Sequence, residues 1–276
     1  MNIKKALHRV LNVMGYEVYN IRRMEIALQQ SAAREFNKWK WARDIGIELI
    51  LDIGANTGQF AETIAKVLPN ARLISFEPIS SCYDKLCERM SWNPRFKAYE
   101  LALWDSTQEL EFNANEWSPS SSALELAPLH KQLYPFAVQT KKEMVRSMRL
   151  DDLLEEIKFS GRTLIKMDVQ GAESKVIQGG REAFMKSSAV MVEVSFWELY
   201  RGQALFHDIY GQLGELGYTF IGQMEQVVRP SDHLPVYADA LFINRSQTGA
   251  LFPQAHHSHR HQPCQAEKAV DGNIGS

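Results

Sequence analysis

The sequence lacks the features of disulfide-rich, zinc-binding and membrane-spanning proteins. It has three cysteines, Cys82, Cys87 and Cys264, and no CxxC pair. An odd number without paired spacing argues against a disulfide framework or a zinc site, and reduced thiols favour a cytoplasmic protein. No stretch of about 20 apolar residues is present, so we expect no integral membrane segment.

The chain also lacks an excess of charge of either sign. Its 31 basic and 33 acidic side chains give a net charge of -2. Proteins that bind nucleic acid usually carry a broad positive field, so no nucleic-acid partner is expected. Hydrophobic residues make up 45% of the 276 residues. A chain of this length and composition can bury a core without a disulfide or metal to hold it.

The composition divides the chain into three regions. Residues 1–47 are predicted to form a helical extension, and residues 246–276, which are rich in His and Gln, to form a flexible tail. Leu7, Val10, Leu11 and Met14 recur at helical spacing. This short amphipathic helix could pack on its own domain, contact an anionic membrane surface, or supply a homodimer contact.

Residues 48–245 have the pattern of an α/β domain. Seven short apolar runs alternate with amphipathic helical segments, and continuous apolar runs are typical of parallel strands that are buried on both faces. The pattern predicts a doubly wound, mostly parallel, Rossmann-like sheet with helices on both faces. Residues 104–150 show no convincing crossover helix and are expected to form a functional loop or lid. The predicted strands cover residues 49–53, 72–76, 97–103, 163–169, 189–194, 218–222 and 240–244, and the predicted helices 58–68, 80–90, 172–186 and 205–216.

A candidate cofactor loop follows the first strand, in the segment LILDIGANTGQF at residues 49–60. Gly54 and Gly58 permit a tight turn into a helix, but Asn56 stands where a dinucleotide loop needs its second glycine, and no Lys-Ser/Thr pair of a phosphate loop follows. A carboxylate at Asp52 would repel a pyrophosphate but attract the sulfonium and ammonium groups of S-adenosylmethionine. Glu77, at the end of the second strand, can accept hydrogen bonds from both ribose hydroxyls.

Six stretches, in this order, resemble the FkbM family of class I methyltransferases. The resemblance implies a seven-stranded sheet with its last strand antiparallel, and methyl transfer to a hydroxyl. It also implies that Asp52, Gly54, Asn56 and Gly58 line the methionine part of the cofactor. The family commonly has Glu where this chain has Gln170, so one possible carboxylate is absent. The stretches are LDIGANTGQF (51–60), ISFEP (74–78), ALWDS (102–106), MRLDDLLEE (148–156), LIKMDVQGAESKVIQGG (164–180) and VMVEV (190–194).

The catalytic candidates are two carboxylates near the end of the fourth strand. A sugar hydroxyl is a poor nucleophile, so a general base should help. Asp168 lies where ligands bind in such sheets and is expected to contact the cofactor as well as to act in catalysis, and Glu173 begins the next helix. The pair could serve as base and substrate anchor, or hold a divalent cation, although we predict no resident metal. Glu193 and Ser121 are the candidates for binding the acceptor substrate.

Together these patterns predict an S-adenosylmethionine-dependent enzyme that O-methylates a small-molecule or glycan acceptor, such as a sugar or a natural product. Two alternatives remain at this point. One is transfer of another group, such as aminopropyl, from a related sulfonium. The other is a catalytically silent partner subunit that binds the nucleoside.

Overall fold

The computed structural model describes residues 30, 33–115 and 118–248. The predicted helix at Leu7–Met14 and the predicted tail lie outside the described residues, so the homodimer contact stays a prediction. Of the N-terminal extension, the structure describes helix α3 (Lys40–Asp44), which buries Ala42. Trp39, directly before α3, is also buried and packs its ring edge-on against Phe60. The end of the extension is therefore part of the packed domain.

A central sheet of seven strands, in the order β3-β2-β1-β7-β8-β10-β9, confirms the predicted fold. Neighbours from β3 to β8 pair in parallel, whereas β10 is antiparallel to both β8 and β9. The inner strands β1 and β7 are buried along their whole length, which explains their continuous apolar sequences. The strands are β1 (Leu49–Ile53), β2 (Arg72–Phe76), β3 (Phe96–Tyr99), β7 (Thr163–Met167), β8 (Ala189–Ser195), β9 (Tyr218–Val228) and β10 (Pro235–Asn244).

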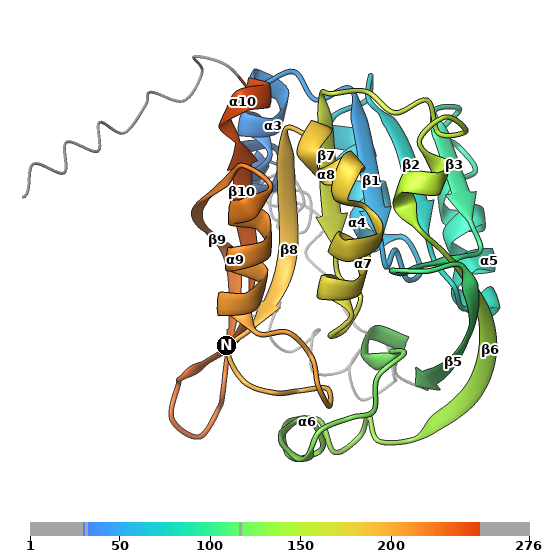
Figure 1. Cartoon of the computed structure of the whole chain (residues 1–276), viewed down its shortest axis with the longest axis vertical. Coiled ribbons are helices and arrows are strands. Elements are labelled where there is room, and N and C mark those ends of the chain that lie inside the picture. The colour runs from blue at the N-terminus through green and yellow to red at the C-terminus, as the bar shows by residue number, and fades with distance from the viewer. Residues whose placement is uncertain (1–29, 31–32, 116–117, 249–276) are drawn as a thin grey trace, which may run out of the picture.

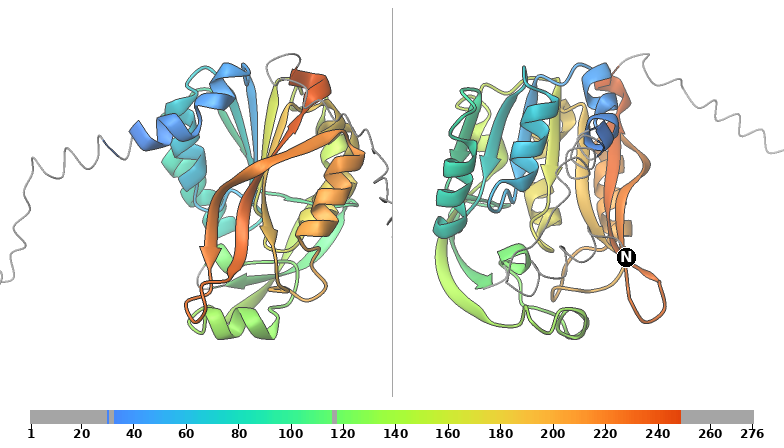
Figure 2. Two further views of the ribbon diagram at one scale, coloured as in Figure 1. Left: turned by 90° about the vertical axis from the view of Figure 1, so that its left-hand side faces the viewer. Right: turned by 180° about the vertical axis from the view of Figure 1, so that it is seen from behind.

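Helices cover both faces of this sheet, and Figure 2 shows the sheet between two helical layers. On one face, Val176, Phe184 and Leu213 pack against the sheet in one hydrophobic core. On the other face, Ile64 and Leu86 belong to a second core. The first layer holds α7 (Glu173–Gly179), α8 (Arg181–Lys186) and α9 (Phe206–Glu215), and the second holds α3, α4 (Gln59–Val67) and α5 (Ser80–Met90).

A second sheet of three strands occupies the interval that the sequence predicted to be irregular. Its order is β4-β6-β5, with β5 and β6 antiparallel. The expected strand at 97–103 was wrong as one element, because the chain leaves the central sheet after Tyr99 and enters the second sheet at Ala102. The interval contains β4 (Ala102–Leu103), β5 (Gln108–Asn115), η1 (Ser118–Ser120), α6 (Pro128–Leu133), β6 (Thr140–Met148) and η2 (Leu150–Leu153).

Two further elements differ by more than a residue or two from the prediction in a way that the structure explains. The helix expected at 172–186 is divided into α7 and α8 by Gly180, whose φ of -124° lies outside the helical region. Gly179, beside it, lies so close to the chain after β4 that a Cβ there would be 1.9 Å from the Trp104 carbonyl oxygen. The hairpin β9–β10 extends beyond both predicted runs, because its outer part is half-exposed and alternates.

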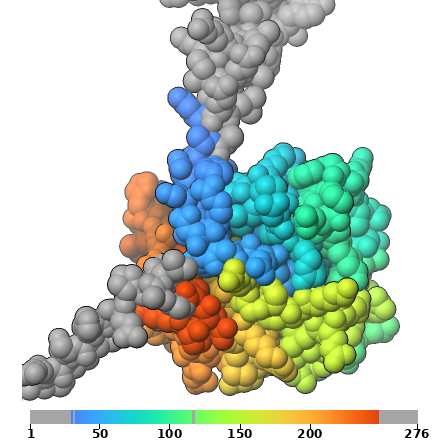
Figure 3. All heavy atoms as spheres, turned by 90° about the horizontal axis from the view of Figure 1, so that it is seen from above, coloured from blue at the N-terminus to red at the C-terminus, as the bar shows by residue number. Residues whose placement is uncertain are grey.

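The carboxyl ends of the central strands and the two terminal helices lie at opposite edges of the sheet. The carboxyl ends of β1, β2 and β7 meet at one edge, toward the bottom of Figure 1, beside the second sheet. Helices α3 and α10 (Arg245–Thr248) lie near each other at the other edge, seen from above in Figure 3. The loops that the sequence predicts to bind ligand therefore gather at the carboxyl edge.

Candidate active site

The loop after β1 has a backbone that requires glycine. Gly54 has a φ of +79°, and a Cβ there would lie 1.9 Å from the carbonyl oxygen of Asp168. Asn56, at +48°, and Gly58, at +85°, also have left-handed conformations. The N–H groups of Gly54 and Ala55 donate to the Phe76 carbonyl, at 3.0 and 3.1 Å. The loop is therefore fixed between the ends of β2 and β7.

Glu77 follows β2 and is held by this same loop. Its Oε2 accepts a hydrogen bond from the Asn56 N–H at 2.8 Å, and its Oε1 accepts one from the Ile79 N–H at 3.0 Å. Burial raises the pKa of Glu77 to about 7, although both backbone donors favour its ionised form. A carboxylate has about four acceptor positions, so this one can accept further hydrogen bonds from a ligand.

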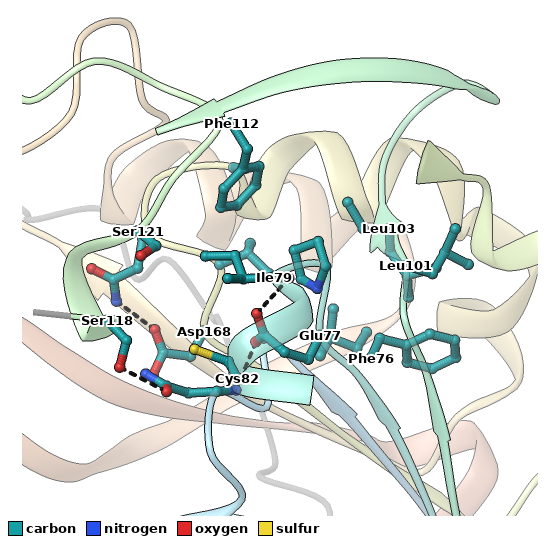
Figure 4. A pocket seen from close by; sticks show the side chains of 18 of the residues that line it. Phe76, Glu77, Ile79, Cys82, Leu101, Leu103, Phe112, Ser118, Ser121 and Asp168 are labelled. Carbon is teal, nitrogen blue, oxygen red and sulfur yellow. Dashed lines mark hydrogen bonds between the residues drawn. The ribbon is translucent and has the colours of Figure 1, made fainter. Parts of the chain in front are cut away.

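A cavity of about 700 Å³, including its open mouth, lies at the carboxyl ends of β1, β2 and β7 (Figure 4). One part of its wall is polar and the other is apolar, as a ligand with a ribose and a flat base would require. The second sheet supplies Phe112, and the segment after it supplies Ser118 and Ser121. The polar wall includes Gly54, Asn56, Glu77, Asp168 and Gln170, and the apolar wall includes Phe76, Ile79, Leu101, Leu103 and Phe112.

Asp168 lines the cavity one residue after β7. Its Oδ2 lies 3.5 Å from the Lys166 ammonium, and its Oδ1 accepts a hydrogen bond from Gln170 Nε2 at 2.5 Å. The backbone N–H of Asp168 donates to the Ile53 carbonyl at 3.0 Å, so the residue is anchored beside the cofactor loop. A carboxylate held by these partners at the cavity wall is placed to accept a proton from a bound hydroxyl.

Asp52 and Gly58, two of the predicted cofactor residues, lie behind the cavity wall. Asp52 is completely buried, 3.7 Å from Lys166 and 3.3 Å from the Ser75 hydroxyl. Burial raises the pKa of Asp52, and the charge of Lys166 opposes this effect. Lys166 was not singled out in the sequence. The signal was its position as a charged residue inside the apolar strand LIKM, because a buried lysine needs acidic partners.

Glu173 holds the turn after β7 rather than lining the cavity. Its Oε1 accepts hydrogen bonds from the N–H groups of Val169 and Gly171, at 3.1 and 3.2 Å. Burial raises its pKa to about 7. The turn between these donors is left-handed at Gln170 and Gly171, with φ values of +54° and +96°. The geometry gives Glu173 a contact with the turn, whereas its predicted catalytic role stays a prediction.

Of the two predicted substrate residues, Ser121 lines the cavity and Glu193 does not. The Ser121 hydroxyl accepts a hydrogen bond from the Asn115 N–H at 2.9 Å. Glu193 lies two residues before the end of β8, and its Oε1 is 3.3 Å from Gln170 Nε2. Burial and the neighbouring Asp168 raise the pKa of Glu193 well above its usual range. Glu193 is thus linked to Asp168 through Gln170.

Within the described part of the chain, no three His, Cys, Asp or Glu side chains are grouped so that they could hold a metal ion. A search of the same residues finds no helix long and apolar enough to span a bilayer.

Residues 52–220 match the family model described as the methyltransferase FkbM domain. The 2-O-methyltransferase NoeI of Sinorhizobium fredii is 35% identical over 162 residues, which are 56% of this chain and 66% of that protein. Methyltransferase sdnD of Sordaria araneosa is 30% identical over 177 residues, 55% of this chain and 63% of that protein. The chain therefore matches slightly less than two thirds of either relative.

Solved structures with bound cofactor are more distant. The magnesium protoporphyrin IX methyltransferase of Synechocystis with bound SAM is 9% identical, with a TM-score of 0.42, and the match covers 88% of this chain and 98% of that one. The family model covers more than half of the chain and includes the Asp52 loop, Glu77 and the Asp168 turn. This match confirms the predicted family, and the chain belongs to the FkbM methyltransferase family.

Proposed function

We propose that this chain transfers a methyl group from S-adenosylmethionine to a hydroxyl of a sugar, a glycan or a natural product. The observation that carries the proposal is a single cavity lined by the Gly54–Asn56 loop, Glu77 and Asp168. One relative is named as a 2-O-methyltransferase, which supports a hydroxyl acceptor. The aminopropyl and silent-subunit alternatives receive no support from the family match.

The residues of the cavity fit this cofactor. Glu77 is fixed by two backbone donors and retains free acceptor positions for the ribose hydroxyls. Phe76, Leu101 and Leu103 offer apolar contacts for an adenine ring. Asp168 is in contact with Gly54, so it lies beside the part of the loop where the methionine moiety would be held.

When bound, S-adenosylmethionine supplies an electrophilic methyl group. The chain's own residues orient the acceptor hydroxyl in line with that methyl group, which is the main requirement of a direct displacement. Asp168 Oδ2 would accept the hydroxyl proton, while Lys166 and Gln170 hold this carboxylate in place. Ser121 and Glu193 are proposed to contact the acceptor.

Calorimetric titration with S-adenosylmethionine and with S-adenosylhomocysteine tests the cofactor site. We expect both to bind the purified chain, and Glu77→Ala to weaken both by at least about tenfold, since two charge-assisted hydrogen bonds are lost. Absence of binding to the wild-type chain would sink the proposal.

Turnover tests the acceptor. Incubation of methyl-labelled S-adenosylmethionine with sugars and glycan extracts should give a methyl ether, identified by mass spectrometry. Asp168→Asn should abolish its formation while retaining cofactor binding. Unchanged turnover in this variant would remove Asp168 from the mechanism. The cytoplasmic location and the homodimer remain predictions.

A further inference from the structure

A chain of side-chain hydrogen bonds runs from Tyr200 through Gln170 to Asp168. The Tyr200 hydroxyl donates to Gln170 Oε1 at 2.5 Å. Gln170 Nε2 donates to Asp168 Oδ1 at 2.5 Å and to Glu193 Oε1 at 3.3 Å. All three hydrogen-bonding functions of this amide, one acceptor and two N–H donors, are therefore used.

Tyr200 fixes which way the amide points. Its side chain is 1% exposed, and burial raises its pKa, so the hydroxyl keeps its proton. The hydroxyl also has an interaction with Ser120, which lies 3.0 Å from His130 Nε2. A donor at Tyr200 requires the oxygen of Gln170 on its side, so the nitrogen must face the two carboxylates.

The backbone also holds Gln170 in place. Its left-handed φ of +54° costs free energy in a residue with a Cβ, so it persists only where the surroundings enforce it. The Ser122 hydroxyl donates to the Gln170 carbonyl at 2.7 Å, and Glu173 accepts the N–H groups on either side of Gln170. At Gly171, a Cβ would be 2.9 Å from Tyr200 Cβ, so the turn is packed against Tyr200.

The charges around this turn explain why an amide suits the position. The Lys166 ammonium lies 3.5 Å from Asp168 Oδ2. An ionised Glu at position 170 would add a further negative charge and could not donate to Asp168, whereas the amide donates without adding charge. The titratable groups that face this region are Lys166 on β7, Asp52 on β1, Glu173 on α7, Glu193 on β8, Asp239 and Tyr237 on β10, and Tyr200.

We propose that Gln170 is a positioning residue, whose amide, oriented by Tyr200, holds Asp168 Oδ1 toward the cofactor, while Oδ2 stays 3.5 Å from the Lys166 ammonium. The inference rests on the proposed function, because it takes S-adenosylmethionine as the ligand of the cavity. Without the amide, Asp168 Oδ1 would also be free to turn toward Lys166, so that both oxygens face the ammonium and less negative charge faces the cavity. The site would then lose part of its preference for a positively charged sulfonium over the neutral thioether of S-adenosylhomocysteine.

The test compares the dissociation constants of these two ligands by calorimetry on the full chain. Their ratio reports negative charge near the sulfonium, whereas a general loss of packing lowers both affinities together. In Gln170→Ala, we expect the preference for S-adenosylmethionine to fall by about fivefold or more relative to wild type at pH 8. Tyr200→Phe should lower the preference in the same direction, by a smaller factor. Gln178→Ala, which removes an exposed amide bonded to Ser174, should leave the ratio unchanged.

Gln170→Glu separates charge from position. When protonated at pH 5.5, the new carboxyl can donate to Asp168, so the ratio should lie near the wild-type value at that pH. At pH 8, its added negative charge should raise the preference above wild type, opposite to the effect of Gln170→Ala. The wild-type ratio at each pH corrects for the other groups that titrate in the region.

The outcomes distinguish the two proposals. If wild-type protein binds neither ligand, the proposed function fails, and the positioning role, which rests on it, fails as well. If wild type binds both and the ratios of Gln170→Ala and Tyr200→Phe stay within about twofold of wild type at every pH, the positioning role alone is overturned. If Gln170→Ala fails to fold, Tyr200→Phe still tests the positioning role, because this substitution removes one hydroxyl and no backbone contact.

Discussion

Glu77 is a buried carboxylate that the ligand-free fold keeps partly protonated near neutral pH. Its pKa is raised from 4.5 to about 7. Because the folded state binds this proton more tightly than the unfolded state, the stabilisation is complete below about pH 4.5 and is lost as the pH rises to about 7. Protonation at this position is thus linked to folding.

We therefore predict that the free energy of unfolding of the ligand-free chain falls between pH 4.5 and 7, with up to about 3 kcal/mol from Glu77. Glu77→Gln should remove the contribution of Glu77, so that the free energy of unfolding changes less between pH 4.5 and 7. Urea unfolding at a series of pH values measures it. Parallel curves for variant and wild type would contradict the linkage. Glu173, whose pKa is also raised to about 7, contributes in the same direction in both proteins.

Gly54 is the residue at which the cofactor loop and the Asp168 turn meet. Gly54→Ala should lower the free energy of unfolding by more than about 2 kcal/mol, since its Cβ would collide with a backbone oxygen at a positive φ. Gly211→Ala is the matched control, because this exposed position in α9 has open space around it. We expect that substitution to stabilise the helix by about 0.5 to 1 kcal/mol. Similar losses in both variants would show that the contact is unimportant.

For single residues, the sequence predicted which ones lie together at the carboxyl edge of the sheet, but not which side-chain atoms are in contact. Spacing and strand ends placed Gly54, Glu77 and Asp168 at one edge, and the structure puts all three on the cavity wall. For Asp52, the sequence could not show that its side chain faces Lys166 in the next strand, because that depends on the register of β1 with β7. For Glu173, the left-handed turn that supplies its two N–H donors leaves little trace in the sequence.

Among the elements, β5 and β6 were missed because their sequences lack a strong apolar face. Most positions of both strands are exposed or half-exposed, and the buried apolar residues Phe112 and Val145 stand among mostly polar ones. Periodicity detects strands through burial, so a half-exposed sheet edge resembles a loop in sequence. By contrast, β1, β2 and α5 have the predicted bounds, because their burial pattern is regular.

The second sheet is connected to the cofactor loop by the segment that follows β5. The Ser118 hydroxyl donates to Asn56 Oδ1 at 2.9 Å. Ser118→Ala should reduce affinity for S-adenosylmethionine by about threefold to tenfold, because one hydrogen bond that orders the loop is lost. Ser106→Ala, in the same interval but bonded to Asp105, should have no effect on binding. Calorimetry on both variants measures the difference, and equal affinities would separate this segment from the cofactor site.

Across the whole molecule, Lys166 balances negative charge from several strands. It lies close to Asp52 and Asp168, and the charges of Glu193 and Asp239 also raise its pKa. A buried carboxylate that loses its partner is strongly destabilising. The charge of Lys166 therefore links the central strands in addition to their backbone hydrogen bonds.

Lys166→Met should lower the free energy of unfolding by about 3 to 5 kcal/mol at pH 8. The loss should be smaller at pH 5, because burial raises the pKa of Asp239 to about 6, so this carboxyl is mostly neutral there. Burial also raises the pKa values of Asp52 and Glu193, which favours their protonation at the lower pH. Urea unfolding at the two pH values tests this dependence. Lys175→Met, which breaks an exposed pair with Asp105, should cost less than about 1 kcal/mol at either pH. A loss for Lys166→Met that is the same at both pH values would contradict the charge argument.

The position of α3 and α10 at the amino edge of the sheet has a consequence for how this domain can be joined to others. The antiparallel β10 returns the chain to the edge where β1 begins, since Ile243 pairs with Ala189 at the start of β8. A fusion partner, an affinity tag or a surface tether joined directly next to α3 or α10 would leave from the side away from the cavity. Because α3 and α10 lie near each other, the domain is suitable for circular permutation or for insertion into a larger enzyme. The joined segments would then leave the mouth of the cavity open to the acceptor.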